Sequence, residues 1–130
     1  MTALRLEPFK AFGDLPFSLS VEALVARLGP PTHCARNNVE LNAYDYGHCV
    51  LRFQDSGRLE EITQRAPVLQ LDTVAIPFAA LAAFVLAQDP EAFERAGFLV
   101  SPTYGIAFVP GEPDWVTALA RHCIPTWRAL

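Results

Sequence analysis

The chain is poor in lysine and has no cluster of basic residues. Lys10 is the one lysine among ten basic residues, and the arginines are scattered along a chain of net charge −4. A protein that follows a phosphate backbone carries a basic run or stripe. Its absence argues against nucleic acid as a partner, and the mild negative charge gives a weak preference for basic partners.

A long apolar segment is also missing. The longest apolar run, residues 74–87, has 14 residues, contains Pro77 and is too short to cross a bilayer. The opening stretch, MTALRLEPFKAFGDLPF, lacks the uninterrupted apolar run and the small-residue cleavage site of a secretory signal. Three cysteines, an odd number, argue against a disulfide framework. These features predict a soluble, cytoplasmic protein that does not bind membranes.

No short catalytic motif is present. The sequence contains neither a Walker loop nor the Gly-x-Gly-x-x-Gly fingerprint of dinucleotide binding. The hydroxyl cluster SPTYG, residues 101–105, has no Gly-x-Ser-x-Gly elbow around its serine, which favours a turn. We therefore expect a binding protein more than an enzyme, with no cofactor and no metal.

The composition is typical of a folded protein. It is 52% hydrophobic and 18% charged, far from the polar, highly charged composition of disordered chains. A length of 130 residues fits one domain with one core. We expect residues 1–130 to form a single α+β domain, a mostly antiparallel β-meander with packed α-helices.

Hydrophobic spacing and turn residues predict the elements. Apolar side chains recur at helical spacing over residues 21–28, between a cap at Ser18 or Ser20 and a stop at Gly29. Three meander strands are predicted over residues 40–46, 48–54 and 59–64. The remaining predictions are a short edge strand near residues 4–9, an ambiguous segment at 68–72, helices over 77–88, 89–97 and 114–123, and a hairpin of strands 98–100 and 104–109.

Every histidine in the chain is followed by a cysteine, at residues 33–34, 48–49 and 122–123. Strand alternation directs Cys49 into the core and His48 away from it. Cys123 falls on the buried stripe of the predicted last helix, with His122 one residue off that stripe. Because zinc sites place paired ligands a few residues apart, core cysteines beside surface histidines are favoured over a metal site.

Cys34 is the exception, since it lies in a polar loop. His33 and Arg36 beside it would favour its thiolate, which makes Cys34 a candidate reactive thiol. A cysteine nucleophile also needs a base from elsewhere in the fold, and His48 and His122 are the available histidines.

Carboxylates surround the predicted meander. Paired carboxylates can act as general acid and base, but no spacing fixes two of these at a working distance. Strand carboxylates beside arginines, here Arg52 and Arg58, are more often solvent-exposed cross-strand pairs. The residues concerned are Glu40, Asp45, Asp55, Glu60 and Glu61.

One side of the meander is expected to show tyrosines together with His48 and Arg52. Tyrosine and arginine are residue types that anchor protein interfaces. The alternative is that the tyrosines lie under a helix with their hydroxyls at its rim. The predicted partner-binding residues are Tyr44, Asp45, Tyr46, His48, Arg52 and Glu60.

The segment VEALVARLGPP, followed by ELNAYDYGHCVLRFQDSGRLEEI, resembles the helix, Leu-Gly-Pro stop and β-meander of many small bacterial α+β domains. Among these it resembles the single-domain immunity proteins that neutralise polymorphic toxins. The resemblance covers about the first half of the chain, and no binding residue is carried over from it. It implies a cytoplasmic protein that binds one toxin tightly, often over the toxin's active site.

Two other functions stay open. The first is a small enzyme or ligand-binding protein that uses a pocket between sheet and helices, with Cys34, His48 or His122 near it. The second is a zinc-stabilised domain. The oligomeric state and the identity of a partner do not follow from the sequence.

Overall fold

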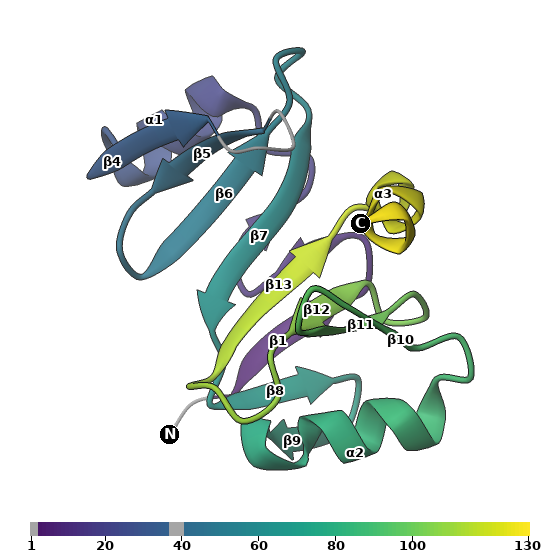
Figure 1. The fold of residues 1–130 in the computed structure, drawn as a ribbon. Helices are drawn as coiled ribbons and strands as arrows, with labels where there is room; N and C mark the ends of the chain where they lie inside the picture. The colour runs from purple at the N-terminus through teal and green to yellow at the C-terminus, as the bar shows by residue number, and fades with distance from the viewer. Residues whose placement is uncertain (1–2, 37–40) are drawn as a thin grey trace.

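The computed structural model describes residues 3–36 and 41–130. Over these residues the chain is α+β, with three α-helices and two sheets whose strand pairs are mostly antiparallel (Figure 1). The predicted class is confirmed. Glu40, the predicted start of the first meander strand, lies outside the described residues.

The larger sheet has eight strands in the order β10-β11-β12-β13-β7-β6-β5-β4. The strands are β4 (His33–Arg36), β5 (Asn42–Asp45), β6 (Cys49–Phe53), β7 (Leu59–Arg65), β10 (Phe93–Arg95), β11 (Phe98–Ser101), β12 (Ile106–Phe108) and β13 (Trp115–Leu119). The predicted meander is confirmed as β5, β6 and β7, and the predicted hairpin as β11 and β12. Part of the predicted polar loop is instead the edge strand β4.

The smaller sheet has the order β3-β2-β1-β8-β9. Its strands are β1 (Leu4–Glu7), β2 (Ala11–Phe12), β3 (Leu15–Pro16), β8 (Val68–Leu71) and β9 (Val74–Pro77). β1 pairs antiparallel with β2 and parallel with β8, so the prediction of an edge strand here is wrong. The ambiguous segment 68–72 supplies β8, the second partner that makes β1 central.

Two of the predicted helices are confirmed. α1 (Val21–Leu28) begins after Ser20, whose hydroxyl accepts a 3.1 Å hydrogen bond from the Ala23 N–H, and ends at Gly29. α2 (Phe78–Gln88) lies against β8 and β9 (Figure 1). In the described part of the chain, no helix combines the length and apolarity needed to cross a membrane.

Two predicted helices are wrong. Residues 89–97 form a turn and β10, because the Asp89 carboxylate accepts hydrogen bonds from Ser101 and Thr103 and does not start a helix. Residues 114–123 form β13 and the 3₁₀ turn η1 (Arg121–Cys123), followed by α3 (Ile124–Ala129). β13 lies between β7 and β12 and its residues 116–119 are buried, so the helical spacing of its apolar residues does not distinguish a helix from a buried strand.

The two faces of the larger sheet have different roles. One face joins the main core, to which both sheets, α1 and α2 contribute, and carries Leu51, Ile62 and Ala118. The opposite face, called here the outer face, carries Arg52 and Glu61. α3 covers part of the outer face over a second apolar cluster, formed by Val100, Ala107, Leu119 and Ile124. The uncovered part of the outer face holds the candidate site.

Candidate functional site

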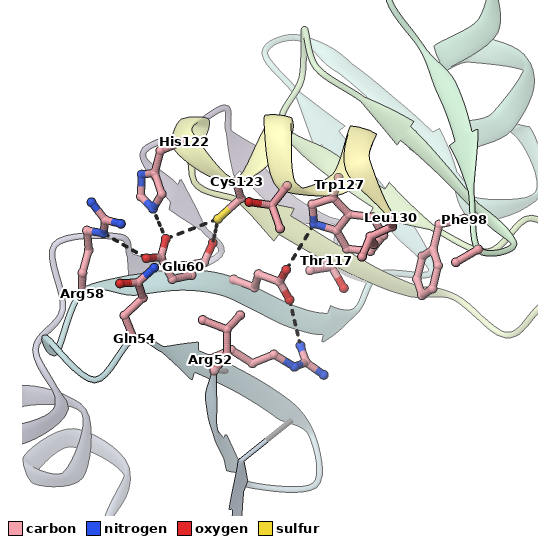
Figure 2. A pocket seen from close by; sticks show the side chains of 14 residues that line it. Arg52, Gln54, Arg58, Glu60, Phe98, Thr117, His122, Cys123, Trp127 and Leu130 are labelled. Carbon is pink, nitrogen blue, oxygen red and sulfur yellow. Dashed lines mark hydrogen bonds and ion pairs between the residues drawn. The ribbon is translucent and has the colours of Figure 1, made fainter. Parts of the chain in front are cut away.

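Two adjoining hollows lie on the outer face of the larger sheet. The larger, of about 590 Å³, lies beside α3 and has Glu60, His122 and Trp127 in its wall (Figure 2). Glu61 also lines it. The smaller, of about 470 Å³, has Arg65, Pro113 and Trp115 in its wall. The two share Arg52, Phe98 and Thr117, so together they form one groove, called here the sheet groove.

A β-bulge places two consecutive glutamates on the same side of β7. Arg52 pairs with Glu61 and the next residue, Phe53, pairs with Leu59, so Glu60 is the extra residue of the bulge. Strict alternation would direct Glu60 and Glu61 to opposite faces, whereas a bulge redirects one side chain. Both glutamates therefore line the larger hollow.

The carboxylate of Glu60 is the centre of a cluster of polar groups. Its side chain is 1% exposed, and Oε1 accepts a 2.9 Å hydrogen bond from Arg58 Nε. Oε2 contacts His122 Nε2 and lies 3.3 Å from Cys123 Sγ (Figure 2). The turn η1 brings His122 and Cys123 to the carboxylate, and the Ala120 N–H just before it donates to the Glu60 carbonyl at 2.9 Å. One carboxylate thus connects β7 to the segment after β13.

Cys123 is a hydrogen-bond donor in this cluster. Burial raises the pKa of the Cys123 thiol, and the hydrogen bond to Glu60 and the charges of Glu60 and Glu61 raise it further. At neutral pH the thiol is protonated and donates to Glu60 Oε2. A protonated thiol is a poor nucleophile, so the arrangement without a metal does not favour covalent catalysis by Cys123.

Glu61 belongs to a second network in the same hollow. Arg52 Nη1 lies 3.7 Å from Glu61 Oε1, and Trp127 Nε1 donates a 3.2 Å hydrogen bond to Oε2. Burial raises the pKa of Glu61, although Arg52 and Trp127 act in the opposite direction. Arg52 also donates to the Thr63 hydroxyl at 2.8 Å, so the base of the groove is held by hydrogen bonds between side chains.

The Glu60 cluster also has the donor atoms of a metal site. Glu60, His122 and Cys123 each offer one ligand atom, and the three atoms lie within 4.8 Å of one another. No local pattern in the sequence reveals this group, because Glu60 is distant in the chain and its side chain reaches His122 only through the bulge. The neighbouring His122 and Cys123 were visible as a pair, but neither a third ligand nor a ligand spacing accompanied them.

The structure separates the tyrosines from Arg52. Tyr44 pairs with Leu51 and therefore faces the core, where its ring packs edge-on against Phe53 with 5.4 Å between centroids. The Tyr46 hydroxyl donates to the carbonyl of Gly29, the C-cap of α1, at 3.0 Å, and burial raises the pKa of Tyr46. The expected common face of tyrosines and Arg52 is thus wrong, because Arg52 points to the outer face.

The other predicted residues are also dispersed. Asp45 accepts a hydrogen bond from the Gly47 N–H in the turn after β5, and His48 is exposed in the same turn. Of the six predicted partner-binding residues, Arg52 and Glu60 line the sheet groove, whereas Tyr44, Asp45, Tyr46 and His48 do not. A role of these six residues in binding stays a prediction.

The candidate catalytic residues predicted from the sequence differ in whether they line the groove. Cys34 is exposed on β4 and, like His48, lies outside the lining of the groove, whereas His122 lies in it. Asp55 Oδ1 lies 2.6 Å from Arg36 Nη1, and Asp55, unlike Glu60 and Glu61, does not line the groove. No local pattern in the sequence indicates Trp115 and Trp127 as groove residues, because their positions depend on strand register and on α3.

Comparison with models of known protein families, with curated proteins and with solved structures finds no match to this chain.

Proposed function

We propose that this protein is a protein-binding module of the immunity kind and that its cognate toxin binds in the sheet groove. The observation that carries the proposal is the lining of the groove. Both tryptophans of the chain, Trp115 and Trp127, line it together with Arg52, Arg58 and Arg65. Tryptophan and arginine dominate the energetics of protein interfaces, which supports a groove built for a protein partner.

The aromatic groups of the groove are held in place before any partner arrives. The guanidinium carbon of Arg65 lies 5.3 Å from the centre of the Trp115 ring, and Trp127 packs edge-on against Phe98 with 5.2 Å between centroids. Side chains that are already ordered lose less conformational entropy on binding. The two connected hollows form a longer groove than either one, which suits a loop or strand of a protein.

The charge of the groove fits recognition by shape and hydrogen bonds. Within it, Arg52 and Arg58 lie beside Glu61 and Glu60, and Arg65 pairs with Asp114. The net charge of −4 favours a basic partner through longer-range attraction. In this proposal the chain acts in the bacterial cytoplasm as one domain with its helices packed on the sheets, and the core that joins both sheets, α1 and α2 supports this architecture.

The test takes each toxin-like domain found encoded near this gene and measures growth rescue and calorimetric binding. Trp115 is 36% exposed, so Trp115→Ala removes a groove side chain without opening the core. We expect it to weaken binding by roughly 30-fold or more, the effect of an interface residue that contributes about 2 kcal/mol. Val25→Ala is the matched control, since Val25 is 37% exposed on α1, outside the groove lining.

Equal affinity of Trp115→Ala and wild type would place the interface outside the groove. Absence of binding to every toxin-like domain encoded nearby would contradict the immunity function itself. Loss of binding in both Trp115→Ala and Val25→Ala would also count against the groove as the specific site.

A small-molecule function is the second candidate, and the size of the larger hollow favours it. Its volume of about 590 Å³ lies within the range of roughly 300–1,000 Å³ typical of small-ligand pockets. His122, one of the histidines expected near such a pocket, lies in its wall beside Glu60. A small ligand whose affinity falls in His122→Ala but is unchanged in Trp115→Ala would favour this function over toxin binding.

A further inference from the structure

We propose that Glu60, His122 and Cys123 bind a zinc ion at the wall of the larger hollow, with a remaining coordination position open to the groove. The inference of this site does not depend on the proposed toxin binding. Three observations support it: the kinds of donor atom, the distances between them, and the hydrogen bonds that hold the ligands in place.

The three donor atoms favour zinc among the common metal ions. They are a carboxylate oxygen, an imidazole nitrogen and a cysteine sulfur. Magnesium and calcium prefer oxygen ligands throughout, whereas zinc accepts sulfur, nitrogen and oxygen together. Three protein ligands are the number found in zinc sites that keep one position for water or substrate. All three residues line the hollow, so such a position would face the groove.

The separation of the Glu60 and Cys123 donor atoms is close to the value that tetrahedral zinc requires. Bonds of about 2.0 Å to oxygen and about 2.3 Å to sulfur place two ligand atoms roughly 3.5 Å apart. Glu60 Oε2 and Cys123 Sγ are 3.3 Å apart, and all three donor atoms lie within 4.8 Å of one another. The His122 side chain, which is 40% exposed, can rotate away from Oε2 to admit the ion. Zinc binding therefore needs a side-chain adjustment and no change of fold.

The groups around Glu60 leave one oxygen for the ion. Arg58 Nε donates to Oε1 and fixes the orientation of the carboxylate, while Oε2 points to His122 and Cys123. Hydrogen bonds of this kind orient metal ligands in known sites. The backbone of Glu60 is held as well, because the Ala120 N–H donates to its carbonyl. The ligands thus come from two segments that are already tied together.

Binding exchanges a proton for the metal. Cys123 coordinates as a thiolate, so its S–H proton passes to solvent when the S–Zn bond forms, and no electron is transferred. The affinity for zinc should accordingly fall as the pH is lowered. The ion would replace the hydrogen bonds that His122 and Cys123 make to Oε2 without metal.

The test is a metal titration of the purified full chain after treatment with a chelator and dialysis. Cobalt(II) is the probe, because a cysteine ligand gives a thiolate-to-cobalt charge-transfer absorption. We expect one equivalent of cobalt to bind with this absorption and one equivalent of zinc to displace it. Cys123→Ser should abolish the absorption and weaken zinc binding by roughly 100-fold or more, since even outer-sphere changes cost about 10- to 100-fold.

Two variants show whether the metal binds at this site and not at another thiol, and whether a loss of affinity comes from unfolding. Cys34→Ser removes the exposed cysteine of β4 and should leave the titration unchanged. His122→Ala changes a partly exposed side chain, so it should remain folded by circular dichroism and still lose zinc affinity. The proposal is wrong if cobalt binds without the charge-transfer absorption, if Cys34→Ser abolishes it, or if no stoichiometric metal binds. The titration contains no toxin, so its failure would leave the test of the proposed function unaffected.

Discussion

The Ser101 hydroxyl donates a 2.6 Å hydrogen bond to the buried carboxylate of Asp89. Thr103 donates two more, from its backbone N–H at 3.0 Å and from its hydroxyl at 2.7 Å. Asp89 is the C-cap of α2, and Ser101 and Thr103 lie at the turn between β11 and β12, so the carboxylate ties the helix to the hairpin. Burial acts to raise the pKa of Asp89, but these hydrogen bonds outweigh it and lower the pKa below its ordinary value.

Asp89→Asn should destabilise the protein by about 2 kcal/mol at neutral pH, because hydrogen bonds to a charged group contribute roughly 1.5–3 kcal/mol. The lowered pKa means that the folded chain binds the Asp89 proton more weakly than the unfolded chain. Its contribution is therefore present above the unfolded pKa of about 3.9 and is lost as the pH falls through the folded pKa. Urea unfolding of wild type and variant at neutral and acidic pH measures this difference.

Asp72→Asn is the control for Asp89→Asn, since Asp72 is exposed in the turn between β8 and β9. It should change the free energy of unfolding by less than about 0.5 kcal/mol. If the loss in Asp89→Asn stayed constant down to acidic pH, the charge of Asp89 would not be the source of its effect.

Gly105→Ala should destabilise the protein by about 2–4 kcal/mol. Gly105 has φ +64°, and a Cβ there would lie 2.7 Å from Cε1 of Phe9, whose ring is also covered by the Arg121 guanidinium at 3.9 Å. The expected loss combines about 1–2 kcal/mol for positive φ with about 1–2 kcal/mol for overpacking. Chemical unfolding measures the loss.

Gly47→Ala is the control, because Gly47 has φ +86° and open space around its Cβ position. Equal losses in both variants would show that the Phe9 ring moves aside without cost.

The sequence predicted the parts of the fold that depend on local signals. α1 has both a helical stripe and a serine cap, and the meander strands have short turns between them. The prediction of secondary structure failed where pairing between strands distant in the chain determines the structure. Val116, Leu119 and Ala120 fit a helical spacing, yet they belong to a segment in which β13 is covered on both faces, where apolar spacing does not distinguish a helix from a strand.

The candidate site was predictable only in part. His122 was named as a candidate beside a pocket, and Cys123 was expected to be buried. Glu60 lies 62 residues before His122 and reaches it through a bulge that no local pattern reveals. The predicted face of tyrosines and Arg52 failed for a related reason, because strand register places Tyr44 beside Leu51 and Arg52 beside Ala43.

The three cysteines should differ in reactivity toward iodoacetamide in the metal-free folded protein. Cys34 is exposed, whereas Cys49 is buried and burial raises its pKa to about 11. A rise of about 2 units from the usual range lowers the thiolate fraction roughly 100-fold, so Cys49 should react at least that much more slowly than after unfolding. Cys123 should also be slow, because burial and Glu60 raise the pKa of its thiol.

Mass spectrometry of labelled peptides identifies which cysteine reacts. Cys34→Ser should remove the fast phase, and denaturation should make the remaining two cysteines react at similar rates. Fast labelling of Cys123 in the folded, metal-free protein would contradict the structure of the Glu60 cluster.

In Glu61→Gln, the free energy of unfolding should depend less on pH than in the wild type, over the range just above the ordinary pKa of a carboxyl group. Burial raises the pKa of Glu61 despite Arg52 and the hydrogen bond from Trp127, so the folded chain binds this proton more tightly than the unfolded chain. The free energy of unfolding of the wild type therefore falls as the pH rises from about 4.3, the unfolded value, through the folded pKa. Glutamine keeps a carbonyl oxygen that accepts the Trp127 hydrogen bond, and it does not titrate. The free energy of unfolding of the variant should therefore not fall in this way. Urea unfolding across this range measures the pH dependence of both proteins, with Glu22→Gln, at an exposed position of α1, as the control. If the wild type instead gained stability over the variant with rising pH, the Arg52 pair would outweigh burial.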